Sequence, residues 1–211
     1  MIKKYFPHFL LAVYVVEFIW AGINPYSRAV WYAENGPIVA LVIFIVILYI
    51  RKIRFSNLAY ALMFILPFLH TIGGHYTFER VPFEWFGNMF GFERNMFDRF
   101  GHFAVGFYAL PIMEYLFSRG LVAKKWIGAT YSVFAISFVA VSYEWIEWWY
   151  AATYGGSAGA AFLGSQGDIW DAQKDMLMDV SGAVIAVVIY FTIAMLYKNK
   201  MTGEKDVQNQ P

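Results

Sequence analysis

Six apolar segments alternate with polar segments along the whole chain. They cover residues 6–23, 37–50, 57–72, 100–117, 126–150 and 175–197. A membrane-spanning helix needs about 20 apolar residues, because each residue adds about 1.5 Å toward the roughly 30 Å of hydrocarbon. The pattern predicts an all-α, polytopic membrane helical bundle of about six transmembrane helices. We expect one integral membrane domain at 1–200, followed by a polar, disordered cytoplasmic tail at 201–211.

The second segment is the shortest of the six. Pro37 precedes it, and Arg51, Lys52 and Arg54 follow it closely. Two interpretations stay open: the segment crosses as a tilted helix, or it dips into the bilayer and returns. The first segment resembles a signal peptide, but no small-residue cleavage site follows it, so we expect it to be retained.

Lysine and arginine are concentrated in alternate connections. Eleven fall on one predicted side, and five fall on the other: Arg28, Arg80, Arg94, Arg99 and Lys174. Short loops rich in positive residues stay in the cytoplasm, so both termini are predicted to be cytoplasmic. Seven of the eight tryptophans lie at or beyond the opposite boundary. This distribution supports the same orientation, because tryptophan favours membrane interfaces.

Composition removes several classes of function. Hydrophobic residues make up 60% of the 211 positions and charged residues 15%, which is poor for a soluble domain. A net charge of +1 offers no broad positive field, so nucleic-acid binding is not expected. The absence of cysteine excludes disulfides, thiolate zinc sites and iron–sulfur clusters.

Polar side chains from four different segments share one depth. His70, His102, Glu144 and Asp179 each lie 16 to 18 residues from the predicted cytoplasmic end of their segment. That spacing corresponds to roughly 24 to 27 Å along a helix, in the outer part of the membrane. Ionisable groups at such depth are unfavourable without partners, so we expect them to meet in one outward-facing site.

Three aspartates in the last segment repeat every fourth residue. Asp171, Asp175 and Asp179 therefore fall on one helix face if the helix begins by Asp171. Like charges stacked in this way repel and need compensation by a divalent cation, an arginine or protonation. For Asp171 a role at the helix N-terminus is an equally good interpretation.

Two further pairs have the spacing of metal-ligand or acid–base groups. Asp98 and His102 are four residues apart, so a carboxylate can share a cation with the imidazole or fix its tautomer. Glu144 and Glu147 are three residues apart in "SYEWIEWWY". Either glutamate can act as a general base if it faces the bundle interior.

The third segment ends in "HTIGGHYTFERVP". Paired glycines commonly end a helix, so Gly73 and Gly74 predict a sharp turn that aims His75 back at the bundle. A lone histidine at a helix end is more often structural, and His75 is accordingly the least specific of the metal candidates.

The resulting hypothesis is a site that binds a divalent cation and acts on a lipid or lipid-linked head group, as a metal-dependent hydrolase or transferase would. Glu144 and Glu147 are the catalytic candidates. Mixed histidine and carboxylate ligands favour zinc or manganese, whereas aspartates alone would suit magnesium or calcium, and no organic cofactor is expected. The metal candidates are His75, Asp98, His102, Asp171, Asp175 and Asp179, and the arginines expected to bind an anionic head group are Arg80, Arg94 and Arg99.

Four segments of the chain resemble one known family. They are "GGHYTFERVP" (73–82), "RNMFDRFGHF" (94–103), "YEWIEWW" (143–149) and "FLGSQGDIWDAQKDM" (162–176). These motifs are similar to those of the YjdF-like family of bacterial inner-membrane proteins, and the resemblance covers most of the chain. It implies a multi-pass protein of the bacterial cytoplasmic (inner) membrane and supplies no reaction.

A fainter resemblance is to VanZ-like membrane proteins, which are associated with tolerance to glycopeptide antibiotics. Asp98, Arg99, His102 and Phe103 are similar to their Asp-Lys/Arg-x-x-His-Phe signature. Their later Glu-x-x-Gln and Asp-x-x-x-Asn-x-x-Gly signatures would fall on Glu144, Glu147, Asp175, Asp179 and Gly182. Here Glu147 replaces a glutamine and Asp179 an asparagine, which makes the site more acidic.

Two alternatives remain beside the cation hypothesis. A VanZ-like envelope protein would bind an amphiphile or antibiotic target in the same polar layer without transforming it. An ion-coupled transporter would also place acids in the membrane, but the inner half of each segment nearly lacks them. The partners expected are membrane lipid and a lipid-linked or amphiphilic ligand.

Overall fold

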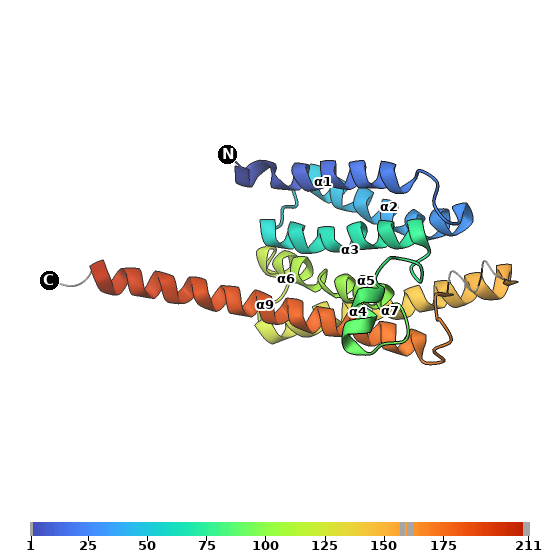
Figure 1. Ribbon diagram of the computed structural model, residues 1–211. Coiled ribbons are helices and arrows are strands. Elements are labelled where there is room, and N and C mark those ends of the chain that lie inside the picture. The colour runs from blue at the N-terminus through green and yellow to red at the C-terminus, as the bar shows by residue number, and fades with distance from the viewer. Residues whose placement is uncertain (1, 157–158, 160–162, 209–211) are drawn as a thin grey trace.

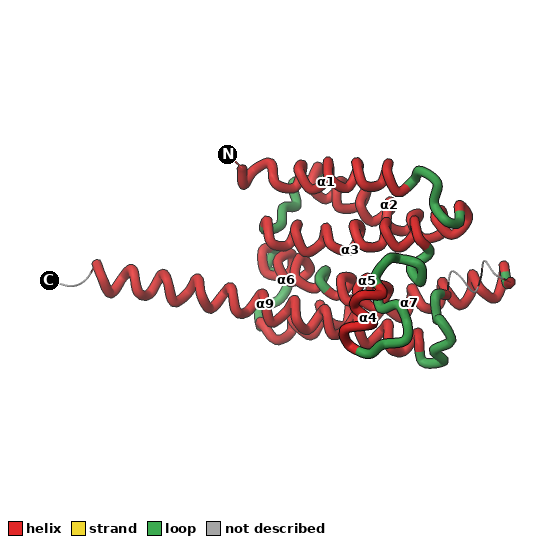
Figure 2. Tube along the Cα trace, in the orientation of Figure 1, coloured by secondary structure: helices red, strands yellow, loops and turns green. Residues whose placement is uncertain are grey.

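The computed structural model describes residues 2–156, 159 and 163–208, and this part of the chain consists of helices and loops without a strand (Figure 2). The helices are α1 (Ile2–Ala21), α2 (Arg28–Ile50), α3 (Asn57–Tyr76), α4 (Glu84–Phe90), α5 (Phe97–Gly106), α6 (Ala109–Ser118), α7 (Lys125–Tyr154) and α9 (Asp171–Gln208).

Four of the described helices are long and apolar enough to cross a membrane. They are α2, α3, Lys125–Thr153 of α7 and Asp171–Leu196 of α9, and Tyr5–Ala21 of α1 is a shorter apolar helix. The chain is therefore a polytopic helical membrane protein. Six crossings and cytoplasmic termini stay predictions.

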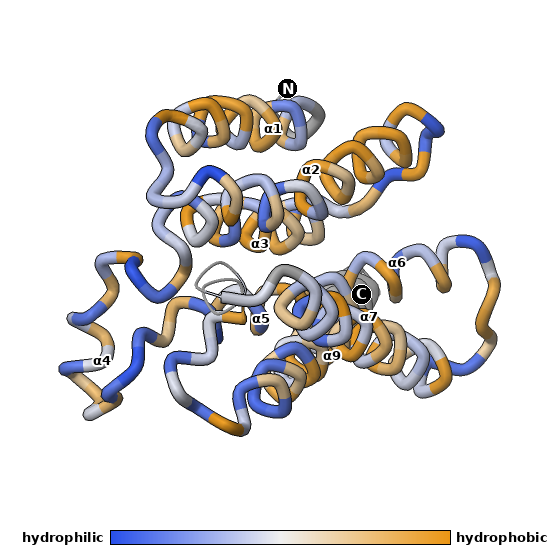
Figure 3. The backbone as a smooth tube through the Cα atoms, turned by 90° about the vertical axis from the view of Figure 1, so that its right-hand side faces the viewer, coloured by the Kyte–Doolittle hydropathy of each residue, from blue (hydrophilic) through white to orange (hydrophobic). Residues whose placement is uncertain are grey.

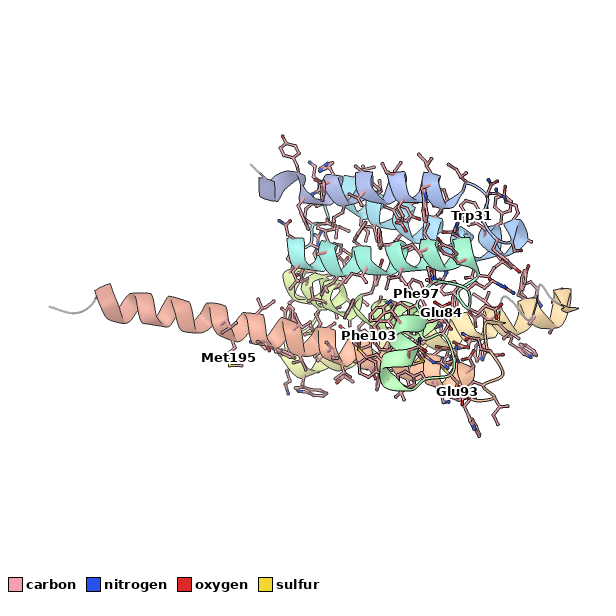
Figure 4. The ribbon with its side chains drawn as sticks, in the orientation of Figure 1. Trp31, Glu84, Glu93, Phe97, Phe103 and Met195 are labelled. Atoms are coloured by element: carbon pink, nitrogen blue, oxygen red, sulfur yellow. The ribbon has the colours of Figure 1, made fainter. Side chains whose placement is uncertain are left out.

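The bundle has two layers whose helix axes run in similar directions. Helices α1, α2 and α3 form one layer, and α5, α6, α7 and α9 form the other, with α4 at the side (Figures 1 and 3). The start of α1 and the end of α9 point to the same end of the bundle, and α9 extends well beyond the other helices there (Figure 1). Met195 lies on this extension (Figure 4). The helix runs on to Gln208, into the segment for which composition predicts disorder, and residues 209–211 lie outside the described part.

Helix α2 starts nine residues before the predicted segment, so the predicted boundary at residue 37 is wrong. Ser27 caps the helix, and its Oγ accepts a hydrogen bond from the Val30 backbone nitrogen at 3.4 Å. Pro37 lies inside the helix, where it removes one backbone hydrogen bond without ending it. The resulting 23-residue helix is long enough to cross the membrane.

Helix α3 runs through the paired glycines to Tyr76, so the prediction that they end the helix is wrong. The glycines permit close packing instead. A Cβ at Gly73 would lie 2.4 Å from the Phe78 ring, and one at Gly74 would lie 2.5 Å from Nδ2 of Asn35. Thr77 caps the end of the helix and adopts the left-handed conformation.

The fourth predicted segment is two helices rather than one. The interruption falls at residues 107 and 108, between α5 and α6. Pro111 lies four residues after Phe107 and has no N–H for the Phe107 carbonyl, and its ring crowds that carbonyl. The chain bridges the break with shorter turns, in which the Phe107 and Tyr108 nitrogens bond to the carbonyls of residues 104 and 105.

Candidate functional site

A cavity of about 240 Å³ lies between the two layers, toward the end of the bundle away from the termini. Its polar lining comes from both layers. Helices α2 and α3 contribute Glu34 and His70, and helices α5, α7 and α9 contribute Asp98, His102, Tyr143, Glu147 and Asp179. The structure therefore brings together groups that are more than 100 positions apart in the sequence.

Two glycines set the distance between the polar faces of α5 and α9. A Cβ at Gly182 would lie 2.1 Å from the Phe103 carbonyl oxygen, and one at Gly106 would lie 2.3 Å from the Ala183 nitrogen. No side chain fits at either position without moving a helix. The crossing thus places the first turns of α5 against the first turns of α9, where the ionisable residues lie.

Arginines from the other segment compensate the aspartate stack. Arg99 is 3% exposed, and its Nη2 lies 2.5 Å from Oδ1 of Asp171. Its Nη1 pairs with Oδ1 of Asp175. Arg94 also pairs with Asp171 and lies 3.8 Å from Asp98. Of the three forms of compensation that the sequence left open, the structure shows arginine at Asp171 and Asp175.

Asp168 lies at the edge of this network of arginines and aspartates. Its Oδ2 accepts a 2.6 Å hydrogen bond from Nζ of Lys174, and its Oδ1 accepts one from the Trp170 nitrogen. The hydrogen bond from Lys174, followed by that from the backbone, holds the pKa of Asp168 below its usual range. Asp168 therefore remains an anion at neutral pH.

Asp98, His102 and Asp175 form a candidate cation site. One ligand atom from each lies within 4.8 Å of the other two. Nε2 of His102 is 3.7 Å from Oδ1 of Asp98 and 3.7 Å from Oδ1 of Asp175. On the other side of the ring, Nδ1 lies 3.2 Å from Oδ2 of Asp179. This bond favours the tautomer that leaves Nε2 free to coordinate.

Asp179 is among the most buried carboxylates of the described residues. It is 1% exposed, and its Oδ1 has no hydrogen-bond partner among them. A buried acceptor of this kind is unfavourable unless something outside the described chain, such as water or a ligand, approaches it. Because Asp179 lines the cavity, it is a candidate acceptor for a hydrogen-bond donor or a cation there.

The two glutamates of α7 are both buried, but they differ in position. Glu147 lines the cavity. Glu144 lies one turn earlier on the helix, and its Oε1 is buried without a hydrogen-bond partner among the described residues. Of the two predicted candidates for a general base, Glu147 thus has the direct route to a molecule in the cavity.

Two predicted site residues lie apart from the cluster. His75 directs Nδ1 at the Ala21 carbonyl oxygen, 2.8 Å away, and its ring stacks on Trp20. Arg80 lies 3.4 Å from Glu79 and over the ring of Tyr26. Because α3 does not turn at the glycines, His75 stays at the helix end and fastens the α1–α2 connection.

Sequence reasoning missed the part of the site on α2 and one residue of α7. Oε2 of Glu34 lies 3.0 Å from Nε2 of His70 and accepts a 3.2 Å hydrogen bond from the Tyr143 hydroxyl. Asn35 accepts a hydrogen bond from Thr71 at 3.0 Å, which fixes α2 against α3. The missed signal was the Ser27 cap, because a helix that begins there carries Glu34 into the membrane.

Comparison with known proteins agrees with the membrane architecture. The family model described as Predicted membrane protein (DUF2238) matches residues 6–195. The chain is 32% identical over 179 residues to the inner membrane protein YjdF of Escherichia coli strain K12, covering 81% of each chain. No solved structure matches the chain. The expected family and the inner-membrane localisation are confirmed.

Proposed function

We propose that this chain, which belongs to the predicted membrane protein family DUF2238, binds a divalent cation in its buried polar cavity and acts on a lipid head group. The cavity lies among helices that are long and apolar enough to cross a membrane. Asp98, His102 and Asp175 would hold the cation. Asp179 would orient His102 without touching the metal.

The observation that carries this proposal is the spacing of the three ligand atoms. In a tetrahedral zinc site with bonds of about 2.0–2.1 Å, neighbouring ligand atoms lie roughly 3.3–3.4 Å apart. The two His102–aspartate separations of 3.7 Å are close to this value. A cation at this position would share Asp175 with Arg99 and would offset the charge of Asp98.

The arginines take a different role from the one predicted by the sequence. Arg94 and Arg99 are already paired with aspartates, so we assign them to charge compensation rather than to anion binding. A cation held by Asp98, His102 and Asp175 would supply Lewis-acid chemistry toward a head-group phosphate. Glu147, which lines the cavity, would act as the general base.

Metal analysis of the purified protein tests the proposal. We expect about one equivalent of zinc or manganese, retained after dialysis against buffer without metal. Asp98→Asn and Asp175→Asn should each lose it, because each removes a charged ligand. Asp168→Asn is the matched control, since Asp168 belongs to the same charge network but lies outside the trio. A wild-type protein without stoichiometric metal, unchanged in Asp175→Asn, would refute cation binding.

A second candidate is a binding protein that does not transform its ligand, as in the VanZ-like alternative. The apolar part of the cavity wall favours an amphiphile in either case, and it includes Pro37, Ile38, Leu41, Leu66 and Val105. Turnover of a lipid in proteoliposomes separates the two functions. An enzyme would lose turnover in His102→Ala, whereas a binding protein would show no turnover even with metal and ligand bound.

A further inference from the structure

The cavity wall carries an excess of acidic side chains over basic ones. Four carboxylates line it, accompanied by two imidazoles, and the described lining contains no lysine or arginine. A cation at Asp98 and His102 would neutralise one side only. Glu34 and Glu147, on α2 and α7, would still present carboxylates to whatever occupies the remaining space.

Glu34 is held rigidly but retains acceptor capacity. It is 2% exposed, and its bonds to His70 and Tyr143 both use Oε2. The lone pairs of Oε1 are used by neither bond. Since a carboxylate has about four acceptor positions, Glu34 can take at least one further donor from the cavity.

Glu147 provides independent evidence that this part of the cavity binds a ligand. Its side chain is 8% exposed and lines the cavity. The carboxylate makes no hydrogen bond or ion pair with any residue in the described part of the chain. The ionised form of a carboxylate buried in this way is unfavourable unless a cation or a donor approaches it, so an anionic Glu147 needs a partner from the cavity.

Aromatic rings complete the same wall. Tyr143 lies one helical turn before Glu147, so both side chains project from one face of α7. Its ring centroid is 6.3 Å from that of His70 and 6.1 Å from that of His102, so Tyr143 contacts both histidines. The Phe78 ring also lines the cavity and packs edge-on against His70. Carboxylates combined with aromatic faces are the chemistry that recognises organic ammonium groups.

We infer that Glu34, Tyr143 and Glu147 form an ammonium subsite beside the cation, so that the cavity accepts a zwitterionic aminoalkyl phosphate head group. This inference rests on the proposed function, because the phosphate is assigned to the cation. The subsite favours a primary over a quaternary ammonium, since the carboxylates accept hydrogen bonds that only N–H groups can donate. The apolar wall receives the start of the acyl chain.

Lipid binding to the purified, metal-loaded protein tests the inference. The probes are lysophospholipids of one chain length with ethanolamine, choline or glycerol head groups, together with free O-phosphoethanolamine. We expect the ethanolamine lipid to bind at least about tenfold more tightly than the other two, equivalent to about 1.4 kcal/mol. The free head group should bind more weakly than the lipid, because it lacks the chain.

Two variants identify the subsite. Glu147→Gln removes a carboxylate and Tyr143→Leu removes the aromatic face, so each should reduce the preference for ethanolamine while leaving metal content unchanged. Glu93→Gln is the matched control, because Glu93 is exposed on the outer side of the α4–α5 connection (Figure 4). The preference should persist in this control.

The outcomes separate this inference from the proposed function. Stoichiometric metal with equal affinity for all three lipids would overturn the ammonium subsite and leave the cation site standing. Preference for ethanolamine in a protein without metal would support the subsite and refute the cation. If free O-phosphoethanolamine binds as tightly as the lipid, the ammonium subsite stands but the ligand is a soluble one.

Discussion

At the scale of single residues, Arg99 has the largest effect on the charge balance of the site. Its guanidinium contacts Asp171 and Asp175 at once and is almost fully buried. A planar group with several donors can bridge two carboxylates in this way, which a lysine cannot reproduce. The same guanidinium competes with a cation for Asp175, so the two positive charges are expected to share that carboxylate.

Replacing Arg99 by methionine should therefore destabilise the protein strongly. Asp175 would lose its arginine while Asp171 would keep Arg94, and breaking a buried ion pair in this way typically costs about 3–5 kcal/mol. The measurement is thermal unfolding in detergent with the apparent midpoint as readout. Arg80→Met is the control, because Arg80 is half exposed and its ion pair should contribute about 1 kcal/mol or less. Added zinc or manganese should raise the midpoint of Arg99→Met more than that of the wild type, and equal shifts would contradict the shared-carboxylate account.

Asp179 should control the affinity of the cation without binding it. Its contact with Nδ1 of His102 orients the ring, and loss of such a partner usually lowers metal affinity about 10- to 100-fold. We expect Asp179→Asn to retain metal in excess zinc but to release it to a chelator at lower concentration than the wild type. Affinity equal to that of the wild type would show that His102 needs no orienting group.

The sequence predicts which residues belong to the site better than it predicts which residues they contact. Helical spacing is enough to place Asp171, Asp175 and Asp179 on one face, and to pair Asp98 with His102. It cannot reveal that Arg99 reaches across to Asp171, because that contact joins positions 72 apart and depends on how closely two helices pack. For the same reason the Glu34–His70 pair was not predicted.

At the scale of elements, glycine and proline have different effects from those that local rules suggest. Pro37 lies within α2 and the pair at Gly73 and Gly74 lies within α3, whereas Pro111 breaks the segment that was expected to be continuous. Helix packing explains the glycines, since each removes a side chain where another group approaches. The existence of the apolar helices was predictable, and their ends and the break were not.

The crossing of α5 and α9 should be the element contact most sensitive to added volume. We expect Gly182→Val to lower stability by about 1–3 kcal/mol or more and to disturb metal binding, because the helices that carry the ligands must separate. Gly36→Ala is a control within a helix, since a Cβ there meets nothing within 4 Å. Alanine at that position should leave stability unchanged or raise it by up to about 1 kcal/mol. Normal metal content in a folded Gly182→Val protein would contradict the role of the crossing.

At the scale of the whole molecule, the cavity lies at the boundary between the two helix layers. Residues before position 77 form one layer, and the helices from α5 onward form the other (Figures 1 and 3). The described cavity carboxylates lie near the end opposite to the termini. If the termini are cytoplasmic, as the lysine and arginine distribution predicts, the cavity faces the outer leaflet, where a lipid head group could enter it.

Accessibility of single cysteines tests this orientation. The chain has no cysteine, so each introduced thiol reports one position. Ile169 lies in the connection before α9 and is 83% exposed, whereas Leu121 lies in the α6–α7 connection and is 60% exposed. In spheroplasts, a membrane-impermeant maleimide should label Ile169→Cys at once and Leu121→Cys only after permeabilisation.

Arg51→Cys, after α2, should behave like Leu121→Cys if α2 crosses the membrane completely. Immediate labelling of Arg51→Cys together with Ile169→Cys, but not of Leu121→Cys, would mean that α2 dips and returns. Immediate labelling of Leu121→Cys but not of Ile169→Cys would place the cavity at the cytoplasmic face.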